Sequence, residues 1–263
     1  MKLPLLHIDL PRDVTALHQI EITSRCSLAC FYCPWPSMPR PKLDMDGLTF
    51  VRALEWVRHF VHETRTQREL NLAGIGESLI HPDFVEYLCA AREACGPEVR
   101  IIFATNGVYP QFKVAKDDAK GYYDACRAYA EQMRPYKPVV WVSLHRPERA
   151  AIAANAFRDA GLLEGMSADP TLNAMDWSGQ VKWFNSARAG QLPCQWLREG
   201  KVMAMADGRL TTCCYDASGV GVVGHVRDPI GTVKVQPYSL CGTCDQVIGV
   251  AGHDQFAKEA PHE

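Results

Sequence analysis

The chain has 263 residues, a formal net charge of -2 and 47% hydrophobic residues. This length suits one large α/β domain, alone or with a small second domain, and the hydrophobic share excludes an intrinsically disordered chain. The near-neutral charge lacks the basic excess that is typical of proteins that bind duplex DNA or anionic lipid. No apolar run is long enough for a membrane span, and residues 1–13 do not have the pattern of an export signal.

Strands and helices are predicted to alternate from residue 18 to residue 160. Apolar runs or alternating patterns predict strands over residues 18–23, 69–73, 100–105 and 139–144. Helical spacing predicts helices over residues 48–61, 84–95, 119–133 and 148–160, the first of them capped by Asp46. This alternation is typical of parallel βαβ units with right-handed crossovers.

Several segments are less regular. Four prolines in residues 34–41 predict an extended loop. In the first helix, the apolar residues expected to face the core are Leu48, Val51, Leu54, Val57 and Val61. Residues 165–178 show no regular pattern, and residues 181–184 are a candidate for a further short strand.

The pattern changes near residue 190. Two short apolar segments, residues 201–205 and 209–212, flank Asp207 and Gly208, which is a strong hairpin signal. Cysteines also become frequent. We therefore predict two domains, an α/β domain over residues 1–189 and a small cysteine-rich domain over residues 190–263.

Eleven cysteines occur in the chain. Without an export signal, a reducing cytoplasm is expected, in which thiolates hold metal clusters instead of forming disulfides. Three of the cysteines lie in helical patterns and are expected to be small core residues, namely Cys89, Cys95 and Cys126.

Cys26, Cys30 and Cys33 form a C-x3-C-x2-C motif directly after the first predicted strand. Iron–sulfur clusters are normally held by four cysteines, so three leave one iron open to a ligand that is not protein. The alternative is a zinc knuckle or a set of buried cysteines, although zinc sites usually pair C-x2-C motifs and close four ligands. Arg25, Arg40 and Lys42 flank this loop and are expected to be exposed.

The three-cysteine motif resembles the cluster motif of the radical S-adenosylmethionine (radical SAM) superfamily. In that family the open iron binds the amino and carboxylate groups of SAM, and an electron from the cluster splits SAM into methionine and a 5′-deoxyadenosyl radical. The resemblance implies a partial (β/α)6 barrel, a SAM-binding 4Fe–4S cluster and a reductant such as a flavodoxin or ferredoxin. The chain has little room for six full units, so the later ones are expected to be short.

Further strand ends resemble the SAM-binding elements of this family. The G-x-G-E sequence with Gly74, Gly76 and Glu77 resembles its G-G-E-P element, in which a carbonyl or carboxylate accepts from the methionine ammonium. The resemblance implies a ribose contact for Ser143, a carboxylate contact for Arg146, a SAM contact for Asn106 and an adenine contact near Tyr32. Each of these has an ordinary alternative, such as a turn or a surface ion pair. No catalytic acid or base can be named.

The C-terminal cysteines form a second pattern. Cys194, Gly208 and Cys213 match the C-x(9–15)-G-x4-C opening of SPASM and twitch domains, and Cys241 and Cys244 add two thiolates. The resemblance implies a twitch-like domain in which these four cysteines hold an auxiliary 4Fe–4S cluster. Cys214 is expected to be a packed neighbour or a substitute ligand. A structural zinc site is the alternative.

The expected activity is reductive cleavage of SAM followed by hydrogen abstraction from a substrate, which is isomerised or oxidised. A small or single-residue target is expected. One specific candidate, from resemblance to small phage proteins, is isomerisation of glycinyl-thymidine in hypermodified DNA, although the charge does not favour a nucleic-acid partner. Dehydrogenation of a sugar-like alcohol and maturation of a ribosomal peptide are alternatives. A non-enzymatic zinc or iron–sulfur binding module is the alternative of another class.

Overall fold

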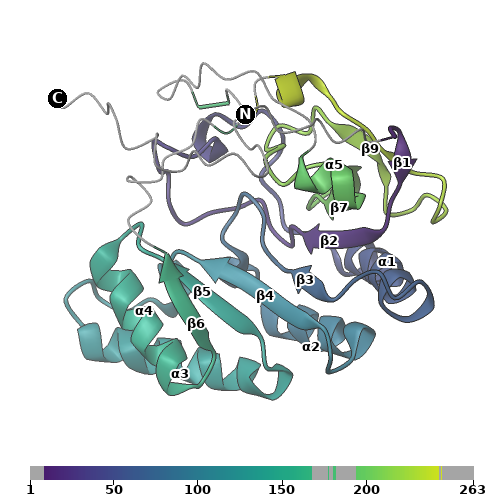
Figure 1. Cartoon of the computed structure of the whole chain (residues 1–263). Coiled ribbons are helices and arrows are strands. Elements are labelled where there is room, and N and C mark those ends of the chain that lie inside the picture. Colours follow the sequence, from purple (N-terminus) through teal and green to yellow (C-terminus); the bar gives the residue numbers. More distant parts are fainter. Residues whose placement is uncertain (1–8, 168–176, 178–179, 182–193, 243, 245–263) are drawn as a thin grey trace, which may run out of the picture.

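The structure is a computed structural model that describes residues 9–167, 177, 180–181, 194–242 and 244. Its centre is an eight-stranded sheet in the order β6-β5-β4-β3-β2-β7-β8-β9 (Figure 1). These strands are β2 (Ala16–Ile20), β3 (Glu69–Asn71), β4 (Arg100–Thr105), β5 (Val139–Ser143), β6 (Leu163–Ser167), β7 (Lys201–Ala204), β8 (Arg209–Thr211) and β9 (Val222–His225). The strands from β6 to β7 pair in parallel, and β8 and β9 then continue the sheet antiparallel.

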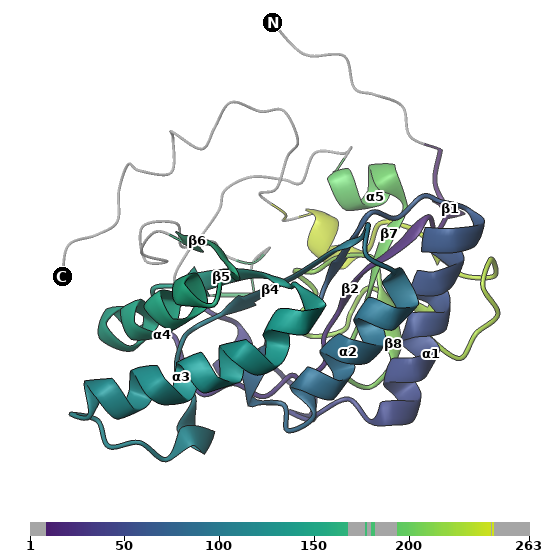
Figure 2. The ribbon, with the colours of Figure 1, turned by 90° about the horizontal axis from the view of Figure 1, so that it is seen from below.

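Four helices cover one face of the sheet, as Figures 1 and 2 show. They are α1 (Gly47–Arg58), α2 (Phe84–Cys95), α3 (Ala119–Met133) and α4 (Pro147–Asp159). Each lies between two successive parallel strands in the chain, so the predicted βαβ alternation is confirmed. The Asp46 carboxylate caps α1 by accepting a hydrogen bond from the backbone N–H of Thr49 at 3.0 Å, as expected.

The face of α1 that enters the core agrees only in part with the predicted one: Leu54 and Val57 are buried as expected, and so is Val61 in the turn after α1. Leu48 and Val51 are 63% and 51% exposed, while the buried residues are Thr49, Phe50, Ala53, Leu54, Trp56 and Val57. An α-helix has 3.6 residues per turn, so positions taken every three residues drift around its surface instead of following one face. The correct core stripe follows the i, i+3, i+4, i+7 pattern that begins at Phe50.

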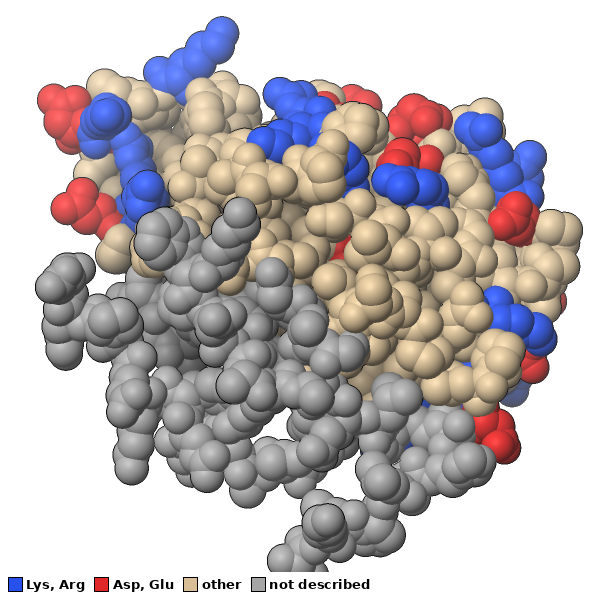
Figure 3. Space-filling model, turned by 90° about the horizontal axis from the view of Figure 1, so that it is seen from above, with Lys and Arg blue, Asp and Glu red and all other residues tan. Residues whose placement is uncertain are grey.

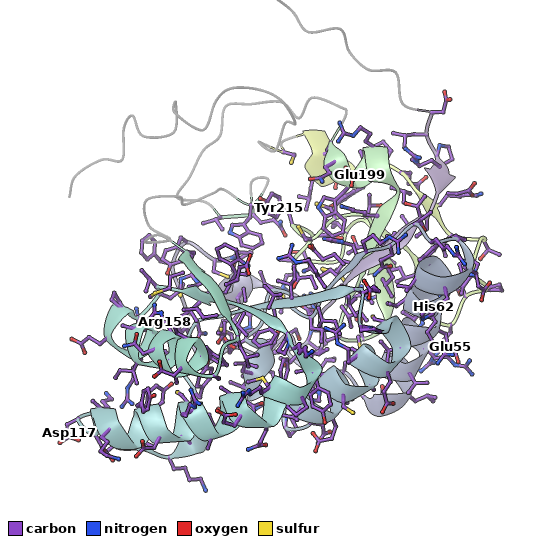
Figure 4. The ribbon with its side chains drawn as sticks, turned by 60° about the horizontal axis from the view of Figure 1, so that its bottom comes forward. Glu55, His62, Asp117, Arg158, Glu199 and Tyr215 are labelled. Atoms are coloured by element: carbon purple, nitrogen blue, oxygen red, sulfur yellow. The ribbon has the colours of Figure 1, made fainter. Side chains whose placement is uncertain are left out.

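A widened turn follows α1. After Arg58 the chain makes one π-helical turn over His59–Glu63. The Nε2 atom of His62 in this turn lies 2.8 Å from the Ala94 carbonyl oxygen, near the end of α2 (Figure 4). This contact joins the end of the first helical segment to the end of the second, on the helical face of the sheet.

The C-terminal segment joins the main sheet. The predicted hairpin is confirmed as β7 and β8, which pair antiparallel. However, β7 also lies parallel to β2, with Ala16 opposite Lys201, so the sheet runs without a break across the proposed boundary at residue 190. The division into two domains therefore stays a prediction. A short helix, α5 (Gln195–Glu199), was not predicted; it precedes β7 and lies on the other side of the sheet from α1–α4 (Figure 2).

Other expectations have mixed outcomes. The first residues of the segment predicted to be irregular, 165–167, belong to β6, whose partly buried residues gave no clear alternating pattern. The loop over residues 34–41 contains one 3-10 turn, Trp35–Ser37. The candidate strand over residues 181–184 lies outside the described residues after Val181. A separate two-stranded sheet pairs β1 (Arg12–Asp13) with β10 (Lys234–Val235). Among the described helices, none is long and apolar enough to cross a membrane.

The fold holds His18 of β2 in its neutral form. Its ring lies edge-on against Trp196 of α5, with centroids 5.4 Å apart. Burial, and next the charge of Lys201, lower the pKa of His18 to about 4. The unfolded chain binds a proton at His18 below pH 6.5, whereas the folded chain does not until about pH 4. Folding stability present above pH 6.5 is therefore lost as the pH falls toward 4, by up to about 3 kcal/mol.

We expect His18→Phe, which keeps an aromatic ring beside Trp196, to remove this acid-side loss. Urea unfolding of both proteins at several pH values between about 4 and 7 measures it. The difference in unfolding free energy between the variant and the original chain should grow in favour of the variant as the pH falls. A constant difference over this range would contradict the assignment.

Candidate functional site

A cavity of about 310 Å³ opens at the edge of the sheet where the parallel strands end. Strands β3, β4, β5 and β6 each contribute residues to its wall, either from their last positions or just beyond them. The carboxyl ends of these parallel strands therefore meet at one cavity. The lining comprises Cys26, Leu28, Cys30, Tyr32, Cys33, Trp35, Ala73, Gly74, Ile75, Gly76, Glu77, Ala104, Thr105, Asn106, Ser143, His145, Ser167 and Trp177.

The loop that carries the three cysteines is closed at its base. The backbone N–H of Ser24 donates to the Leu43 carbonyl at 2.9 Å, and the N–H of Met45 donates to the Ile22 carbonyl at 2.9 Å. Between them, the Thr23 hydroxyl donates to the Asp44 carboxylate at 2.6 Å. These bonds join the two ends of the loop and fix its base at the edge of the sheet.

All three cysteines of this loop line the cavity and are half-buried. Burial raises the pKa of Cys26 to about 12 and that of Cys33 to about 11, and the neighbouring thiols add to both shifts. The sulfur of Cys26 accepts from the Leu28 N–H at 3.4 Å, which favours a thiolate once a cation is present. Three thiols that converge on one cavity fit a cluster with one iron left for a non-protein ligand.

The structure also bears on single metal ions. Among the described residues, no three His, Cys, Asp or Glu side chains gather closely enough to hold one ion. In a four-iron cluster each thiolate binds a different iron, so its cysteines stand further apart than the ligands of a single ion.

The glycine loop, residues 74–77, lies directly against the base of the cysteine loop. The Glu77 N–H donates to the Arg25 carbonyl at 2.8 Å. A Cβ atom on Gly76 would lie 2.4 Å from both the Arg25 and the Thr23 carbonyl oxygens. Only glycine allows this close approach between two backbones, which explains why the motif has glycine here.

We expect Gly76→Ala to push the two loops apart and to destabilise the fold by roughly 1–3 kcal/mol, because rigid backbone atoms occupy the space of the methyl group. Thermal unfolding measures this change. Gly47→Ala is the matched control: its Cβ would meet nothing nearer than 3.9 Å, at the start of α1. The control should be neutral or slightly stabilising. Equal losses in the two variants would contradict this account.

Glu77 is bonded within the chain, and its predicted contact with SAM stays a prediction. Its carboxylate is buried and accepts hydrogen bonds from three donors of its own chain. These are the Thr105 hydroxyl at 2.8 Å, the Asn106 N–H at 2.6 Å and the Leu79 N–H at 3.2 Å. Burial nevertheless raises the pKa of Glu77 to about 7. The carboxylate ties the end of β4 to the glycine loop, so backbone carbonyls of that loop are the better acceptors for an ammonium group.

Asn106 lies beside the first cysteine. Its side-chain amide donates to the Cys26 sulfur at 3.7 Å and to the Ser27 hydroxyl at 3.2 Å, while its carbonyl oxygen accepts from the Val108 N–H at 2.8 Å. These contacts orient the amide toward the cysteine loop. The predicted contact between Asn106 and SAM stays a prediction.

Sequence reasoning gave no functional role to His145. Its Nδ1 atom lies 2.6 Å from the Tyr32 hydroxyl, and the two rings stack with centroids 5.5 Å apart. This pair joins the cysteine loop to the end of β5 across the cavity wall. Ser143 lines the cavity as well, whereas Arg146 is exposed and is absent from the lining. The geometry gives Arg146 no support as a SAM ligand, and the roles of Ser143 and Tyr32 stay predictions.

The four C-terminal cysteines lie near one another. After burial, repulsion from Cys213 and Cys241 helps to raise the pKa of Cys194, and repulsion from Cys213 and Cys244 helps to raise the pKa of Cys241. Cys194 caps α5, with its sulfur accepting from the Leu197 N–H at 3.3 Å. Burial raises the pKa of Cys194 to about 11. A four-thiolate site on these cysteines stays a prediction, and so does its content.

The other cysteines behave as expected with one exception. Cys95 and Cys126 are buried in the core. Cys89 is half-buried on α2, where its thiol contacts the Glu93 carboxylate at 3.7 Å. The prediction of a core role is therefore wrong for Cys89.

Comparison with protein-family models and with curated proteins finds no match. Solved structures do match. BtrN in complex with AdoMet and 2-DOIA superposes with a TM-score of 0.57 at 15% identity, covering 82% of this chain and 79% of that chain. A tagged form of anSMEcpe with bound AdoMet superposes with a TM-score of 0.52 at 14% identity, covering 81% of this chain and 78% of that chain. Native anSMEcpe with AdoMet and the Cp18Cys peptide superposes with a TM-score of 0.50 at 14% identity, again covering 81% of this chain and 78% of that chain.

BtrN and anSMEcpe are radical SAM enzymes. At these identities the likeness concerns the fold, so the chain has the fold of radical SAM enzymes. The three-cysteine loop and the glycine loop lie at the carboxyl edge of its parallel strands.

Proposed function

We propose that this protein is a radical SAM enzyme. The observation that carries the proposal is the cavity in which Cys26, Cys30 and Cys33 face the glycine loop on this fold. These cysteines would hold a 4Fe–4S cluster, which would supply reductive cleavage of bound SAM and, through the resulting radical, abstraction of a substrate hydrogen. The chain itself holds the two loops together through Glu77 and Gly76 and provides a lined cavity that limits access of water.

The second cysteine group is proposed to hold an auxiliary 4Fe–4S cluster on Cys194, Cys213, Cys241 and Cys244, in a twitch-like domain. Four thiolates would complete the coordination of such a cluster, which would supply electron transfer instead of a substrate-binding iron. The mutual electrostatic effects among these cysteines support the proposal.

For the substrate, we propose a small or single-residue target that is isomerised or oxidised. The cavity of about 310 Å³ must also accommodate part of SAM, and aromatic rings of Tyr32, Trp35 and Trp177 line it. Aromatic walls suit a planar ring, so glycinyl-thymidine in DNA is our specific candidate. A base in duplex DNA would have to be flipped out to reach the cavity.

The surface charge offers little support for tight duplex binding. On the face in Figure 3, described Lys and Arg residues alternate with Asp and Glu around an area of other residues. DNA binding at this face would depend weakly on salt, because few phosphates would be neutralised.

The test is an anaerobic reconstitution of the protein. Two clusters require about eight irons per chain, and the EPR spectrum of the reduced protein should change when SAM is added. 5′-Deoxyadenosine should form with reductant. Zinc at both sites, with SAM left intact, would overturn the proposal in favour of a binding module. The substrate proposal is tested separately, with glycinyl-thymidine DNA beside 2-DOIA and a Cp18Cys-type peptide, which are the ligands of the structural neighbours.

A further inference from the structure

A buried carboxylate behind the glycine loop connects three segments of the chain. Glu21 follows β2 and is 0% exposed. Its Oε1 atom accepts from the Ile75 N–H at 3.0 Å and from the Arg40 guanidinium at 2.6 Å. Its Oε2 atom accepts from the Ala206 N–H at 3.1 Å, in the turn between β7 and β8.

Arg40 extends this connection. The sequence predicts an exposed side chain, but Arg40 is buried, and its side chain is 4% exposed. Besides its ion pair with Glu21, the Arg40 Nε atom donates to the Ala217 carbonyl at 2.5 Å. Arg40 lies seven residues after Cys33 in the same loop. The Glu21–Arg40 pair therefore joins the cysteine loop both to the glycine loop and to the C-terminal segment.

The geometry points to the Glu21–Arg40 pair as a positioning device for SAM, an inference that rests on the proposed function. The peptide bond between Gly74 and Ile75 is planar, so fixing the Ile75 N–H toward Glu21 turns the Gly74 carbonyl away from Glu21. A Cβ atom on Gly74 would lie 2.3 Å from Cγ of Glu21, so the loop is held directly against this side chain. Since the Glu77 carboxylate is occupied by its own donors, the orientation of the loop carbonyls sets the affinity for the ammonium of SAM.

Because a buried ion pair has few alternative geometries, it holds this orientation rigidly. Its loss should release the glycine loop without removing any cluster ligand. Loss of the hydrogen-bond partners that orient metal ligands typically costs about 10- to 100-fold in affinity, and we take the same range for partners that orient the loop carbonyls. We therefore expect Glu21→Gln to raise the Kd for SAM by about 10- to 100-fold, with unchanged iron content and a cleavage rate at saturating SAM within a few-fold.

The experiment uses the reconstituted full chain. The Kd is measured from the SAM-induced change in the EPR spectrum, and iron content, cleavage rate and Tm are measured in parallel. The matched control is Gln67→Met. Gln67 is also buried and donates to the Leu17 carbonyl at 2.9 Å, toward the opposite end of β2. The control should lower Tm and leave the Kd for SAM unchanged.

Glu21→Gln leaves Arg40 buried without its charged partner and can reduce the yield of folded protein. The double variant Glu21→Gln/Arg40→Met contains no lone buried charge and keeps the test decisive. If the two residues act as one device, the double variant raises the Kd for SAM about as much as the more affected of the two single variants, Glu21→Gln and Arg40→Met. An unchanged Kd in folded Glu21→Gln or in the double variant, or an equal rise in Gln67→Met, would overturn the inference. If the original chain fails to bind SAM, the proposed function itself fails.

Discussion

Cys30→Ala is expected to abolish formation of 5′-deoxyadenosine. Cys30 lies between the other two ligands of the proposed cluster and lines the same cavity. With two thiolates left, the site no longer retains a four-iron cluster, and SAM loses its binding iron. The reconstituted variant should contain about four irons fewer per chain, and the product should fall below detection by chromatography. This is the largest effect that we expect from a single substitution.

Cys89→Ala is the matched control for this prediction. Cys89 is half-buried on α2, and its thiol contacts Glu93 on the same helix. Iron content and deoxyadenosine formation should equal those of the original chain. If Cys30→Ala kept its iron and its activity, the assignment of this loop as the SAM-binding site would be wrong. Cys241→Ala should remove about four irons and leave the SAM-dependent EPR change in place, which separates the two proposed sites.

Glu77→Gln is expected to change how stability depends on pH. Burial raises the pKa of Glu77 from 4.5 to about 7, so the folded chain binds this proton more tightly than the unfolded chain. The contribution of protonated Glu77 to the free energy of unfolding is fully present below pH 4.5 and is lost as the pH rises to about 7. The shift corresponds to about 3 kcal/mol, as an order of magnitude. Glutamine does not titrate and resembles the protonated acid, so the variant should lack this loss.

Local hydrogen bonding makes this substitution tolerable. The carbonyl of the introduced amide can accept from the Asn106 N–H, and its NH2 group can donate to the Thr105 hydroxyl, which in turn can donate to the Tyr109 hydroxyl 2.7 Å away. The Leu79 N–H loses its acceptor, because it bonds the oxygen that the NH2 group replaces, and this cost is the same at every pH. Urea unfolding of the cluster-free proteins at pH values from about 4 to 8 measures the difference. The variant should gain stability relative to the original chain as the pH rises through this range. A difference that stays constant with pH would show that Glu77 has an ordinary pKa in the folded protein.

The sequence alone was sufficient to predict the features that are formed by residues close to one another along the chain. Helices α2 and α3 and strand β4 lie where hydrophobic periodicity predicted them. The C-x3-C-x2-C loop and the glycine loop also lie at strand ends, as expected. Period and spacing carry this information because a helix or a strand-end loop is formed by residues close in sequence.

The error in α1 shows where periodicity reaches its limit. Leu48 and Val51 are apolar and suitably spaced for a helix, but the sheet lies against the face that begins at Phe50. A helix with apolar residues around much of its surface has more than one candidate core face. The choice between them depends on the packing partner, which is distant in sequence.

The partners of the site residues were decided by the tertiary structure. Tyr32 and His145 are 113 positions apart and meet only because β5 ends beside the cysteine loop. Glu21 and Ala206 are 185 positions apart and are bonded because β7 pairs with β2. A sequence shows which side chains are charged, but not whether a distant strand will bury and pair them. Thus the cysteine motif and the βαβ order follow from the sequence by itself, whereas the burial of Arg40 and the internal role of Glu77 follow from long-range strand pairing.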